Sequence, residues 1–368
     1  MESNDRQVFA AEKIFTGNEW LEEHAVITSG GKIIDIVPSG SLSDRPSIKY
    51  HLLAPAFIDI QIYGAYGKLL SVYPEADSLH KLYNYCSKGG ASHFQPTVAT
   101  NTTEVFYKAI NAVKEYWSEG GKGCLGLHME GPWINPKKKG AHIESFIHSP
   151  LVEEVKELLE YGKDVITMIT LAPEVCSKEV VELIRSYGVI ISAGHSNATY
   201  EEATEAFNSG INAATHLYNA MSPLQHRSPG MAGAIFDHAG VMASIVPDGF
   251  HVDFSAIRIA KKIVKERLFV ITDAVTETDK GPYQHHLVGD KYEAAGILSG
   301  SALTMAKSLQ NLINHVGIEL DEALRMVSLY PAQVMNKADS MGKIEKGYDA
   351  NLVMLDRSLD VRETFGKF

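Results

Sequence analysis

Cysteine is scarce in this sequence, and its positions follow no pairing pattern. Cys86, Cys124 and Cys176 are the three cysteines among 368 residues, and none belongs to a Cys-x-x-Cys motif. An odd number of widely spaced cysteines argues against a disulfide framework and against a thiolate-bound structural metal. The pattern instead favours a reducing compartment, so we expect a cytoplasmic protein.

Long apolar runs and a leader-like N-terminus are also missing. No uninterrupted apolar segment approaches the roughly 18 residues that a membrane-spanning helix needs. The first five residues, 1–5, are polar and acidic, without the basic and apolar parts of a secretory signal. We therefore expect no membrane partner.

Basic residues are in the minority. The chain contains 34 Lys and Arg against 45 Asp and Glu, which gives a formal net charge of −11. Because nucleic-acid binding needs a basic surface, this balance argues against a nucleic-acid partner. Hydrophobic residues make up 45% and charged residues 21%, as is typical of a globular chain with a large core.

The two ends of the chain share a β-rich pattern that differs from the middle. Residues 8–14, 23–28 and 32–37 favour strands separated by glycine turns, and a similar pattern returns at 350–355. We expect a small β-sandwich domain built from both chain ends. Its two parts would be residues 1–53 and 339–368, with a catalytic domain over residues 54–338.

The middle of the chain alternates short apolar runs with helical patterns. Apolar residues at helical spacing predict a helix over 103–117, and Thr199 with Glu202 forms a capping box that begins another. Such alternation is typical of an α/β protein with a parallel sheet. Eight runs favour a closed (β/α)₈ TIM-type barrel, with a doubly wound open sheet as the alternative. The runs are residues 56–61, 92–96, 124–128, 165–171, 189–194, 213–215, 242–246 and 268–272.

Potential ligands and acid–base groups follow six of these eight runs. A (β/α)₈ barrel carries its function at the carboxyl ends of its strands. A single His or Asp there is often structural, for instance as a helix cap, but independent structural roles have no reason to gather at one rim. One carboxylate with two imidazoles and an open position is typical of a catalytic divalent metal site. The residues concerned are Asp59, Gln61, Tyr63, His128, Glu130, His195, His216, Asp248, His251 and Asp273.

Several motifs in a fixed order identify a family. They read HMEGPWINP from residue 128, KGAH from 139, GHSNA from 194, THLYNAM from 215, VPDGFH from 246 and TDA from 272. With them, nearly the whole chain resembles the N-acetylglucosamine-6-phosphate deacetylases of the amidohydrolase superfamily. The resemblance implies hydrolysis of N-acetyl-D-glucosamine 6-phosphate to D-glucosamine 6-phosphate and acetate, in amino-sugar catabolism or recycling.

The resemblance also implies individual roles. Glu130, His195 and His216 would hold one divalent ion per subunit, with Zn as the first choice and Fe, Mn or Co as others. Asp273 would be the general acid–base, and His142 would polarise the acetyl carbonyl. Arg227 would reach the phosphate in the neighbouring subunit, which implies a homodimer. The residues implied to bind the phosphorylated amino sugar are Ala141, Asn219, Ala220, Arg227, His251, Leu298, Ser299 and Gly300.

Two stretches depart from the family pattern. Many amidohydrolases have His-x-His after the first strand and bind a second metal there, where this chain has Gln61 and Tyr63. Both are poorer ligands than imidazole, so we expect one tightly held ion, with Tyr63 occluding the second position. The family loop His-His-Arg-Glu-Pro-Gly reads Gln-His-Arg-Ser-Pro-Gly over residues 225–230, so the charge near the phosphate differs.

Two other functions are open as alternatives. The first is another amidohydrolase-type amidase, which acts on a different N-acyl or cyclic amide and typically has the binuclear site that Gln61 and Tyr63 disfavour. The second is a non-catalytic barrel scaffold, which has no need of the metal ligands or of Asp273. Three lysines at 137–139 are interpreted as a solvated loop, with an anion-steering role left open.

Overall fold

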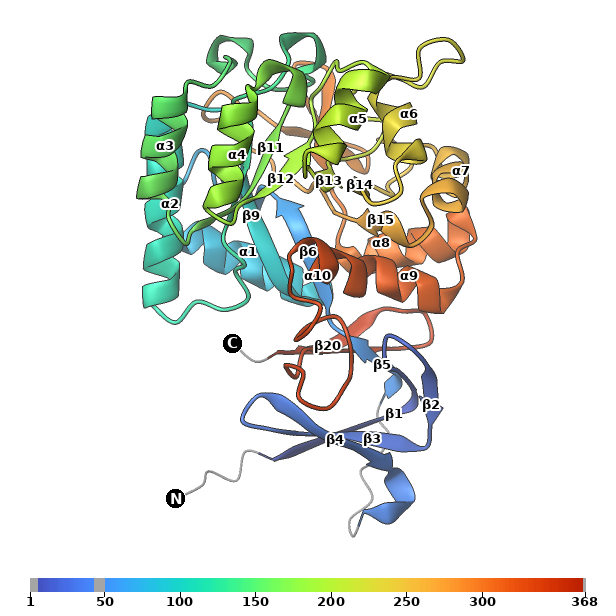
Figure 1. The fold of residues 1–368 in the computed structure, drawn as a ribbon. Helices are drawn as coiled ribbons and strands as arrows, with labels where there is room; N and C mark the ends of the chain where they lie inside the picture. Colours follow the sequence, from blue (N-terminus) through green and yellow to red (C-terminus); the bar gives the residue numbers. More distant parts are fainter. Residues whose placement is uncertain (1–5, 43–49, 367–368) are drawn as a thin grey trace.

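Eight parallel strands form the centre of the larger part of the molecule in the computed structural model, which describes residues 6–42 and 50–366 (Figure 1). The strands are β6 (Phe57–Ile62), β9 (Ala91–Ala99), β10 (Leu127–Glu130), β11 (Ile166–Leu171), β12 (Ile190–Ala193), β13 (Ala213–Ala214), β14 (Met242–Ile245) and β15 (Leu268–Val270). They pair in the order β15-β14-β13-β12-β11-β10-β9-β6. Most of their residues are buried, as expected for a parallel sheet covered by helices.

The two edges of this sheet meet beyond β15. Ala274 forms a parallel bridge with Ile62 of β6. The amide of Asp273 donates to the carbonyl of Gln61 at 3.0 Å, and the amide of Tyr63 donates to the carbonyl of Ala274 at 2.9 Å. The sheet is therefore closed, which confirms the predicted (β/α)₈ barrel over the open-sheet alternative. Closure also places Gln61 and Tyr63 beside Asp273.

Helices cover the outside of the barrel (Figure 1). The predicted helix over 103–117 is confirmed as α2, and the capping box of Thr199 and Glu202 is confirmed at the start of α5. Both helices turn an apolar face towards the strands, which buries that face. The helices are α1 (Ala76–Lys88), α2 (Thr103–Ser118), α3 (Val152–Tyr161), α4 (Lys178–Ser186), α5 (Tyr200–Asn208), α6 (Gly230–Asp237), α7 (Phe254–Val264), α8 (Met305–Asn311), α9 (Leu320–Val327) and α10 (Leu329–Val334).

The third barrel strand begins later than the sequence predicts. The expected run was 124–128, whereas β10 is Leu127–Glu130. Gly123 and Gly126 have φ values of 71° and 100°, which are incompatible with a continuous strand through 124–126. The strand ends at Glu130, two residues beyond His128, so Glu130 lies at the rim of the barrel.

Strands from both chain ends pack together below the barrel in Figure 1. The first part of β1 pairs with β3, and its second part pairs with β2 and β5, so β1 joins these strands in one seven-stranded sheet. From the C-terminal side, β19 lies antiparallel to β5. These strands are β1 (Gln7–Phe15), β2 (Trp20–Glu22), β3 (His24–Ser29), β4 (Lys32–Pro38), β5 (Tyr50–Pro55), β19 (Leu352–Leu355) and β20 (Val361–Phe365). A small β domain from both ends is thus observed, while the domain limits 1–53, 54–338 and 339–368 stay predictions.

A further antiparallel sheet is inserted between the last barrel strand and α8. It consists of β16 (His286–Val288), β17 (Lys291–Ala294) and β18 (Ile297–Ser301), and a short hairpin of β7 (Gly64–Ala65) and β8 (Lys68–Leu69) follows β6. Ser301 of β18 bridges to Ala274, directly after Asp273. The inserted sheet is therefore attached to the rim at which the strand-end residues gather.

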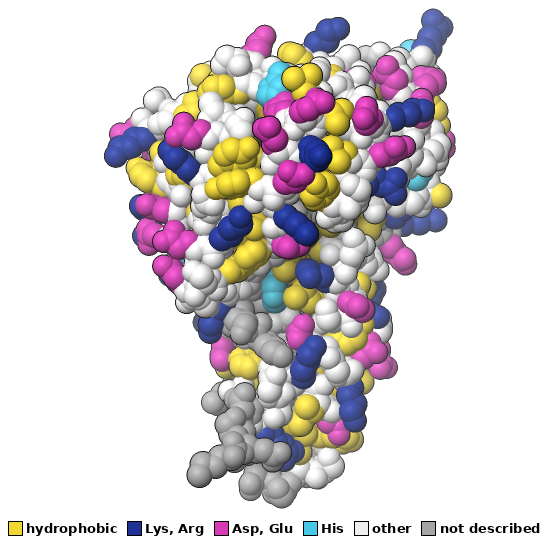
Figure 2. Space-filling view, turned by 60° about the vertical axis from the view of Figure 1, so that its left-hand side comes forward, with side chains coloured by type: hydrophobic (Ala, Val, Ile, Leu, Met, Phe, Trp, Pro, Cys, Tyr) yellow, Lys and Arg dark blue, Asp and Glu magenta, His cyan; other side chains and the backbone are white. Residues whose placement is uncertain are grey.

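The surface carries mixed charge. On the face drawn in Figure 2, acidic and basic side chains are interspersed over the barrel, without separation into areas of one sign. Within residues 6–42 and 50–366, none of the helices has both the length and the apolar character to span a membrane.

Candidate active site

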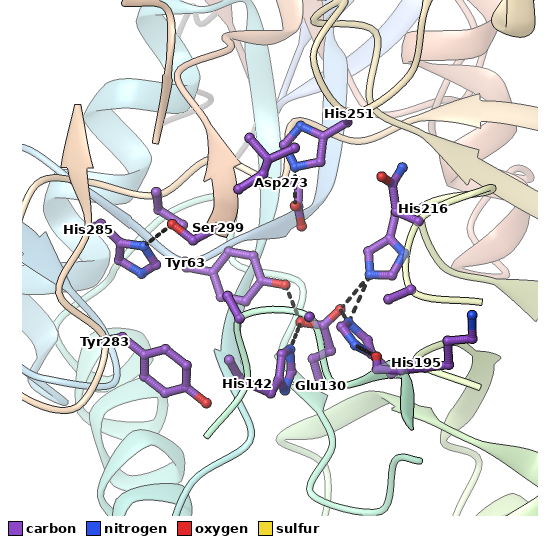
Figure 3. A pocket seen from close by; sticks show the side chains of 18 of the residues that line it. Tyr63, Glu130, His142, His195, His216, His251, Asp273, Tyr283, His285 and Ser299 are labelled. Atoms are coloured by element: carbon purple, nitrogen blue, oxygen red, sulfur yellow. Dashed lines mark hydrogen bonds and ion pairs between the residues drawn. The ribbon is translucent and has the colours of Figure 1, made fainter. Parts of the chain in front are cut away.

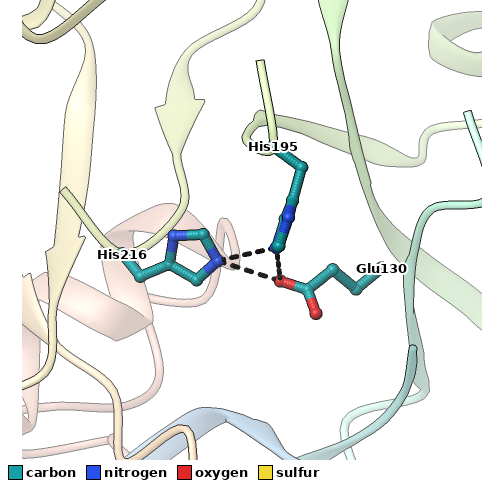
Figure 4. A group of neighbouring side chains, drawn as sticks. All are labelled: Glu130, His195 and His216. Carbon is teal, nitrogen blue, oxygen red and sulfur yellow. Dashed lines mark hydrogen bonds and ion pairs between the residues drawn. The ribbon is translucent and has the colours of Figure 1, made fainter. Parts of the chain in front are cut away.

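Three side chains from the ends of three barrel strands converge (Figure 4). Glu130 is the last residue of β10, and His195 and His216 follow β12 and β13 by two residues. The Nε2 atoms of His195 and His216 lie 3.3 and 3.2 Å from Glu130 Oε1, and 3.1 Å from each other. All three side chains are buried. The structure thus brings together the predicted metal ligands.

The donor atoms of this group fit a divalent cation. The Nδ1–H of His195 donates to the carbonyl of Lys138 at 2.9 Å, which leaves a lone pair on Nε2. Three atoms then face one another: the Nε2 of His195, the Nε2 of His216 and Oε1 of Glu130. A single proton on one of them cannot form hydrogen bonds that satisfy all three atoms. Ligands held at about 2.0 Å by a tetrahedral ion lie about 3.3 Å apart, which matches the spacing of this group.

The protonation states agree with this interpretation. Burial would raise the pKa of Glu130, but hydrogen bonds from the surrounding imidazoles, together with the positive charge of His195 in the acidic range where that ring is protonated, hold it well below its usual value. Burial lowers the pKa of His195 to about 4, so its ring is neutral near pH 7. Burial also opposes protonation of His216, but the hydrogen bond with Glu130 raises its pKa overall. An anionic carboxylate beside a neutral imidazole is what a metal requires.

Two of the predicted metal ligands and the predicted acid–base residue have an unusual backbone conformation. His195, His216 and Asp273 have φ values of 47°, 38° and 54°, in the left-handed region. This conformation costs a non-glycine residue about 1–3 kcal/mol and persists where the surrounding structure holds it. Such residues gather at functional sites, and here all three follow the ends of barrel strands.

Asp273 lies across the cavity from the imidazole pair (Figure 3). Gln61 Nε2 donates to its Oδ1 at 2.9 Å, and His251 Nε2 lies 3.5 Å from its Oδ2. His251 is in turn fixed by Asp248, whose Oδ2 accepts from His251 Nδ1 at 2.6 Å. Burial raises the pKa of Asp273, although the charges of His251 and His216 oppose the shift. The sequence placed Asp248 at a strand end but assigned it no role.

Glu130 Oε2 has its own partners. Tyr63 donates its hydroxyl proton to Oε2 at 2.5 Å, and His142 Nε2 lies 3.1 Å from the same atom. Because that nitrogen faces a carboxylate, it carries a proton, and the hydroxyl of Thr100 at 2.7 Å can donate to Nδ1. Tyr63 therefore contacts the carboxylate of the Glu130–His195–His216 group directly, and His142 presents an N–H beside the same carboxylate. No motif in the sequence pointed to Thr100.

A cavity of about 360 Å³ opens at the carboxyl ends of the strands, and it joins these groups. This volume is in the range of small-ligand sites. Most of the predicted site residues line it, namely Glu130, Ala141, His142, His195, His216, Asn219, Ala220, His251, Asp273, Leu298 and Ser299.

Two predicted substrate-binding residues do not line this cavity. Arg227 is exposed in a short turn in which Gln225 and Ser228 pair through their backbones. Gly300 has a φ of 148°, and a side chain there would meet Val275 Cγ1 at 2.5 Å. Gly300 thus allows β18 to approach Val275, which does line the cavity.

Other lining residues were missed or interpreted differently from the sequence. His285 is buried and its Nδ1 hydrogen-bonds to Ser299 Oγ at 2.8 Å, while burial lowers its pKa to about 4. From the sequence alone, His285 was as compatible with an exposed position as with the mouth of the site, and the structure places it at the cavity. Lys137 and Lys138, interpreted as part of a solvated loop, line the cavity and give its wall positive charge.

Asp59 lies where the barrel closes. Its carboxylate accepts hydrogen bonds from the amide and hydroxyl of Thr272 at 3.2 and 2.5 Å, and from the amide of Gln61 at 3.3 Å. Asp59 is therefore hydrogen-bonded to Thr272, which immediately precedes Asp273, and to Gln61, two residues before Tyr63. Burial raises the pKa of Asp59 to about 7 in spite of these hydrogen bonds.

Known proteins resemble this chain over almost its full length. The amidohydrolase family model matches residues 52–366, and the NagA composite domain model matches residues 11–51. N-acetylglucosamine-6-phosphate deacetylase of Haemophilus influenzae is 33% identical over 362 residues, covering 95% of this chain and 94% of the relative. N-acetylgalactosamine-6-phosphate deacetylase of Escherichia coli O157:H7 is 29% identical, covering 97% of each chain. The crystal structure of N-acetylglucosamine-6-phosphate deacetylase from Pasteurella multocida matches with a TM-score of 0.93 at 33% identity, covering 98% of both chains.

We predict a pH-dependent effect of Asp59→Asn on stability. A carboxyl with a pKa raised from 3.8 to about 7 by folding holds its proton more tightly when folded. It therefore lowers the free energy of unfolding as the pH rises from about 4 to 7, by an amount on the order of 4 kcal/mol. In urea unfolding, the variant should gain stability relative to the wild type over this range. Asp164→Asn, at an exposed position, is the control, and a pH-independent difference for Asp59→Asn would contradict the prediction.

Proposed function

Because this chain belongs to the amidohydrolase family, we propose that it is a metal-dependent hydrolase that deacetylates N-acetyl-D-glucosamine 6-phosphate. The products are D-glucosamine 6-phosphate and acetate, as in amino-sugar catabolism or recycling. The observation that carries this proposal is the approach of Glu130, His195 and His216 within 3.1–3.3 Å, with Asp273 lining the same cavity. The names of the Haemophilus influenzae and Pasteurella multocida relatives support this choice of substrate.

The proposed cation ligands are Glu130, His195 and His216, with one ion per subunit. A divalent ion bound there supplies Lewis acidity that activates water and an amide carbonyl near neutral pH. Zn suits two imidazoles and a carboxylate, and Fe, Mn or Co suit the same mixed set. Tyr63 and His142 occupy Glu130 Oε2 and so leave Oε1 to face the imidazoles.

Asp273 is the proposed general acid–base. Its carboxylate takes a proton from the attacking water and returns it to the nitrogen, because an amine leaves far more readily than its anion. Gln61 and His251 contact its two oxygens and thereby fix their direction. When substrate binds, the Nε2–H of His142 turns from Glu130 Oε2 to the acetyl oxygen and stabilises it as that atom gains negative charge.

The phosphate provides a binding handle remote from the reacting amide. We propose that Asn219, Ala220 and His251 contact the sugar phosphate, together with Ala141 and the Leu298-Ser299-Gly300 segment. Lys137 and Lys138 add positive charge to the wall of the cavity, which attracts an anion. Binding energy from such a group can orient the scissile bond.

We further propose a homodimer in which Arg227 serves the neighbouring subunit. Its guanidinium is exposed and lies outside the cavity of its own chain, and guanidinium groups bind phosphate through paired donors. A cytoplasmic location is part of the proposal, in keeping with three free cysteines.

The main test is acetate release from N-acetylglucosamine 6-phosphate with and without a chelator. We expect turnover that the chelator abolishes and a divalent ion restores, and much lower kcat/KM for unphosphorylated N-acetylglucosamine. N-acetylgalactosamine 6-phosphate should be assayed in parallel, because one relative carries that name. Turnover of cyclic ureides alone would favour the other amidase, and freshly purified protein without a divalent ion would favour the scaffold.

Asp273→Asn should bind metal and substrate but lose turnover, because its amide cannot accept the proton. We expect kcat to fall by about 100- to 10,000-fold, the usual contribution of a positioned acid–base. Metal content, measured by elemental analysis, should match the wild type. Asp279→Asn, at an exposed position, is the matched control, and a near-normal kcat for Asp273→Asn would remove this role.

Arg227→Ala should raise KM for the phosphorylated sugar while changing kcat little. If Arg227 acts across the dimer, mixing Arg227→Ala chains with Asp273→Asn chains should recover activity. In such a mixed dimer, the subunit with an intact Asp273 receives Arg227 from the other chain. An unchanged KM would move the phosphate site elsewhere, and no recovery on mixing would place Arg227 in its own subunit.

A further inference from the structure

Glu174 lies outside the cavity but between two of the proposed metal ligands. It belongs to the 3₁₀ turn Pro173–Val175, which follows β11. In the barrel, β11 is the strand between β10, which ends in Glu130, and β12, which His195 follows. The turn after β11 can therefore reach the loops that carry both ligands.

On one side, Glu174 holds the residues that follow His195. Its Oε2 accepts the hydroxyl proton of Ser196 at 2.7 Å, and its Oε1 accepts from the amide of Asn197 at 2.6 Å. Hydrogen bonds to a carboxylate are stronger than those between neutral groups. They act directly after His195, whose φ of 47° requires support from its surroundings.

On the other side, Glu174 holds the loop that follows Glu130. Its Oε1 accepts from Asn135 Nδ2 at 3.0 Å, and the amide of Asn135 donates to the carbonyl of His195 at 2.9 Å. Asn135 Oδ1 also accepts from the amide of Lys137 at 3.0 Å. The next residue, Lys138, provides the carbonyl that orients the His195 ring.

These contacts form a closed ring. It runs from Glu174 to Asn135, through the turn to Lys138, across to His195, and back through Ser196 and Asn197. His195 is thus held at its carbonyl, at its ring Nδ1 and at the two residues after it. Glu174 contributes three of the hydrogen bonds from a single carboxylate.

We propose that Glu174 is a positioning residue that couples the loops after β10 and β12 and thereby fixes His195 Nε2 beside Glu130. The proposal rests on the metal site put forward above. Glu174 takes no part in proton transfer, since it does not line the cavity. Its contribution is therefore to cation affinity, whereas substrate binding and proton transfer belong to other residues.

The conservative variant discriminates this role from general stabilisation. In Glu174→Gln, the amide oxygen can keep the bonds to Asn135 and Asn197, while the amide nitrogen faces Ser196 Oγ, which can accept instead. Glu174→Ala removes all three bonds. Affinity for the cation should therefore fall in the order wild type, Glu174→Gln, Glu174→Ala.

The experiment measures the Kd for Zn²⁺ of metal-stripped protein by competition with a chromophoric chelator. We expect Glu174→Ala to weaken binding by about 10- to 100-fold, as for other groups that orient metal ligands. At saturating Zn²⁺ it should regain most of the wild-type kcat. Glu182→Ala is the matched control, because Glu182 is exposed on α4 near the same turn and should leave Kd unchanged.

The outcomes separate the two proposals. Wild-type protein without measurable Zn²⁺ affinity would overturn the proposed metal site, and this inference with it. Wild-type binding with an unchanged Kd in Glu174→Ala would overturn only the role of Glu174. If Glu174→Ala does not fold, Asn135→Ala breaks the ring at another point, and an unchanged Kd in that variant overturns the coupling.

Discussion

The buried carboxylate of Glu130 is the group on which the site depends. A carboxylate removed from water is costly unless charged or polar partners surround it. Here Tyr63 and His142 contact one oxygen, and Gln61 and the two imidazoles contact the other. These partners follow different strands or loops around the rim, so a single anion ties the ends of β6, β12 and β13 to that of β10. A divalent cation is the partner that this arrangement fits best.

The barrel makes this convergence possible because it closes. The contact between Ile62 and Ala274 brings the first strand beside the last, and it places Gln61 within reach of both Glu130 and Asp273. The same closure buries Asp59 under the site. In an open sheet the first and last strands would lie far apart, and the metal group and the proposed acid–base would not line one cavity. The chemistry therefore depends on a contact between segments more than 200 residues apart in sequence.

Much of the fold and the site follows from local patterns. The capping box at Thr199 and the apolar spacing of α2 act within a few residues, so the sequence predicts them directly. The eight apolar runs predicted the barrel because each strand is buried on both faces. The start of β10 was misplaced because periodicity does not reveal that Gly123 and Gly126 adopt positive φ. The sequence named Asp248 at a strand end and Lys137 in a loop but left their roles open, as it did the position of His285, because spacing does not encode what a side chain faces.

The sequence by itself determined which chemical groups occupy the strand ends and, through its motifs, the family to which they belong. Tertiary structure decided how these groups meet, including the contact of Tyr63 with Glu130, the ring of hydrogen bonds around His195 and the exposure of Arg227 outside its own cavity. The physical reason is the range of the interactions involved. Helix caps and apolar periodicity act between neighbours in the chain. The hydrogen bonds at the barrel rim join residues that are far apart in sequence, and these residues come within bonding distance only when the barrel has formed.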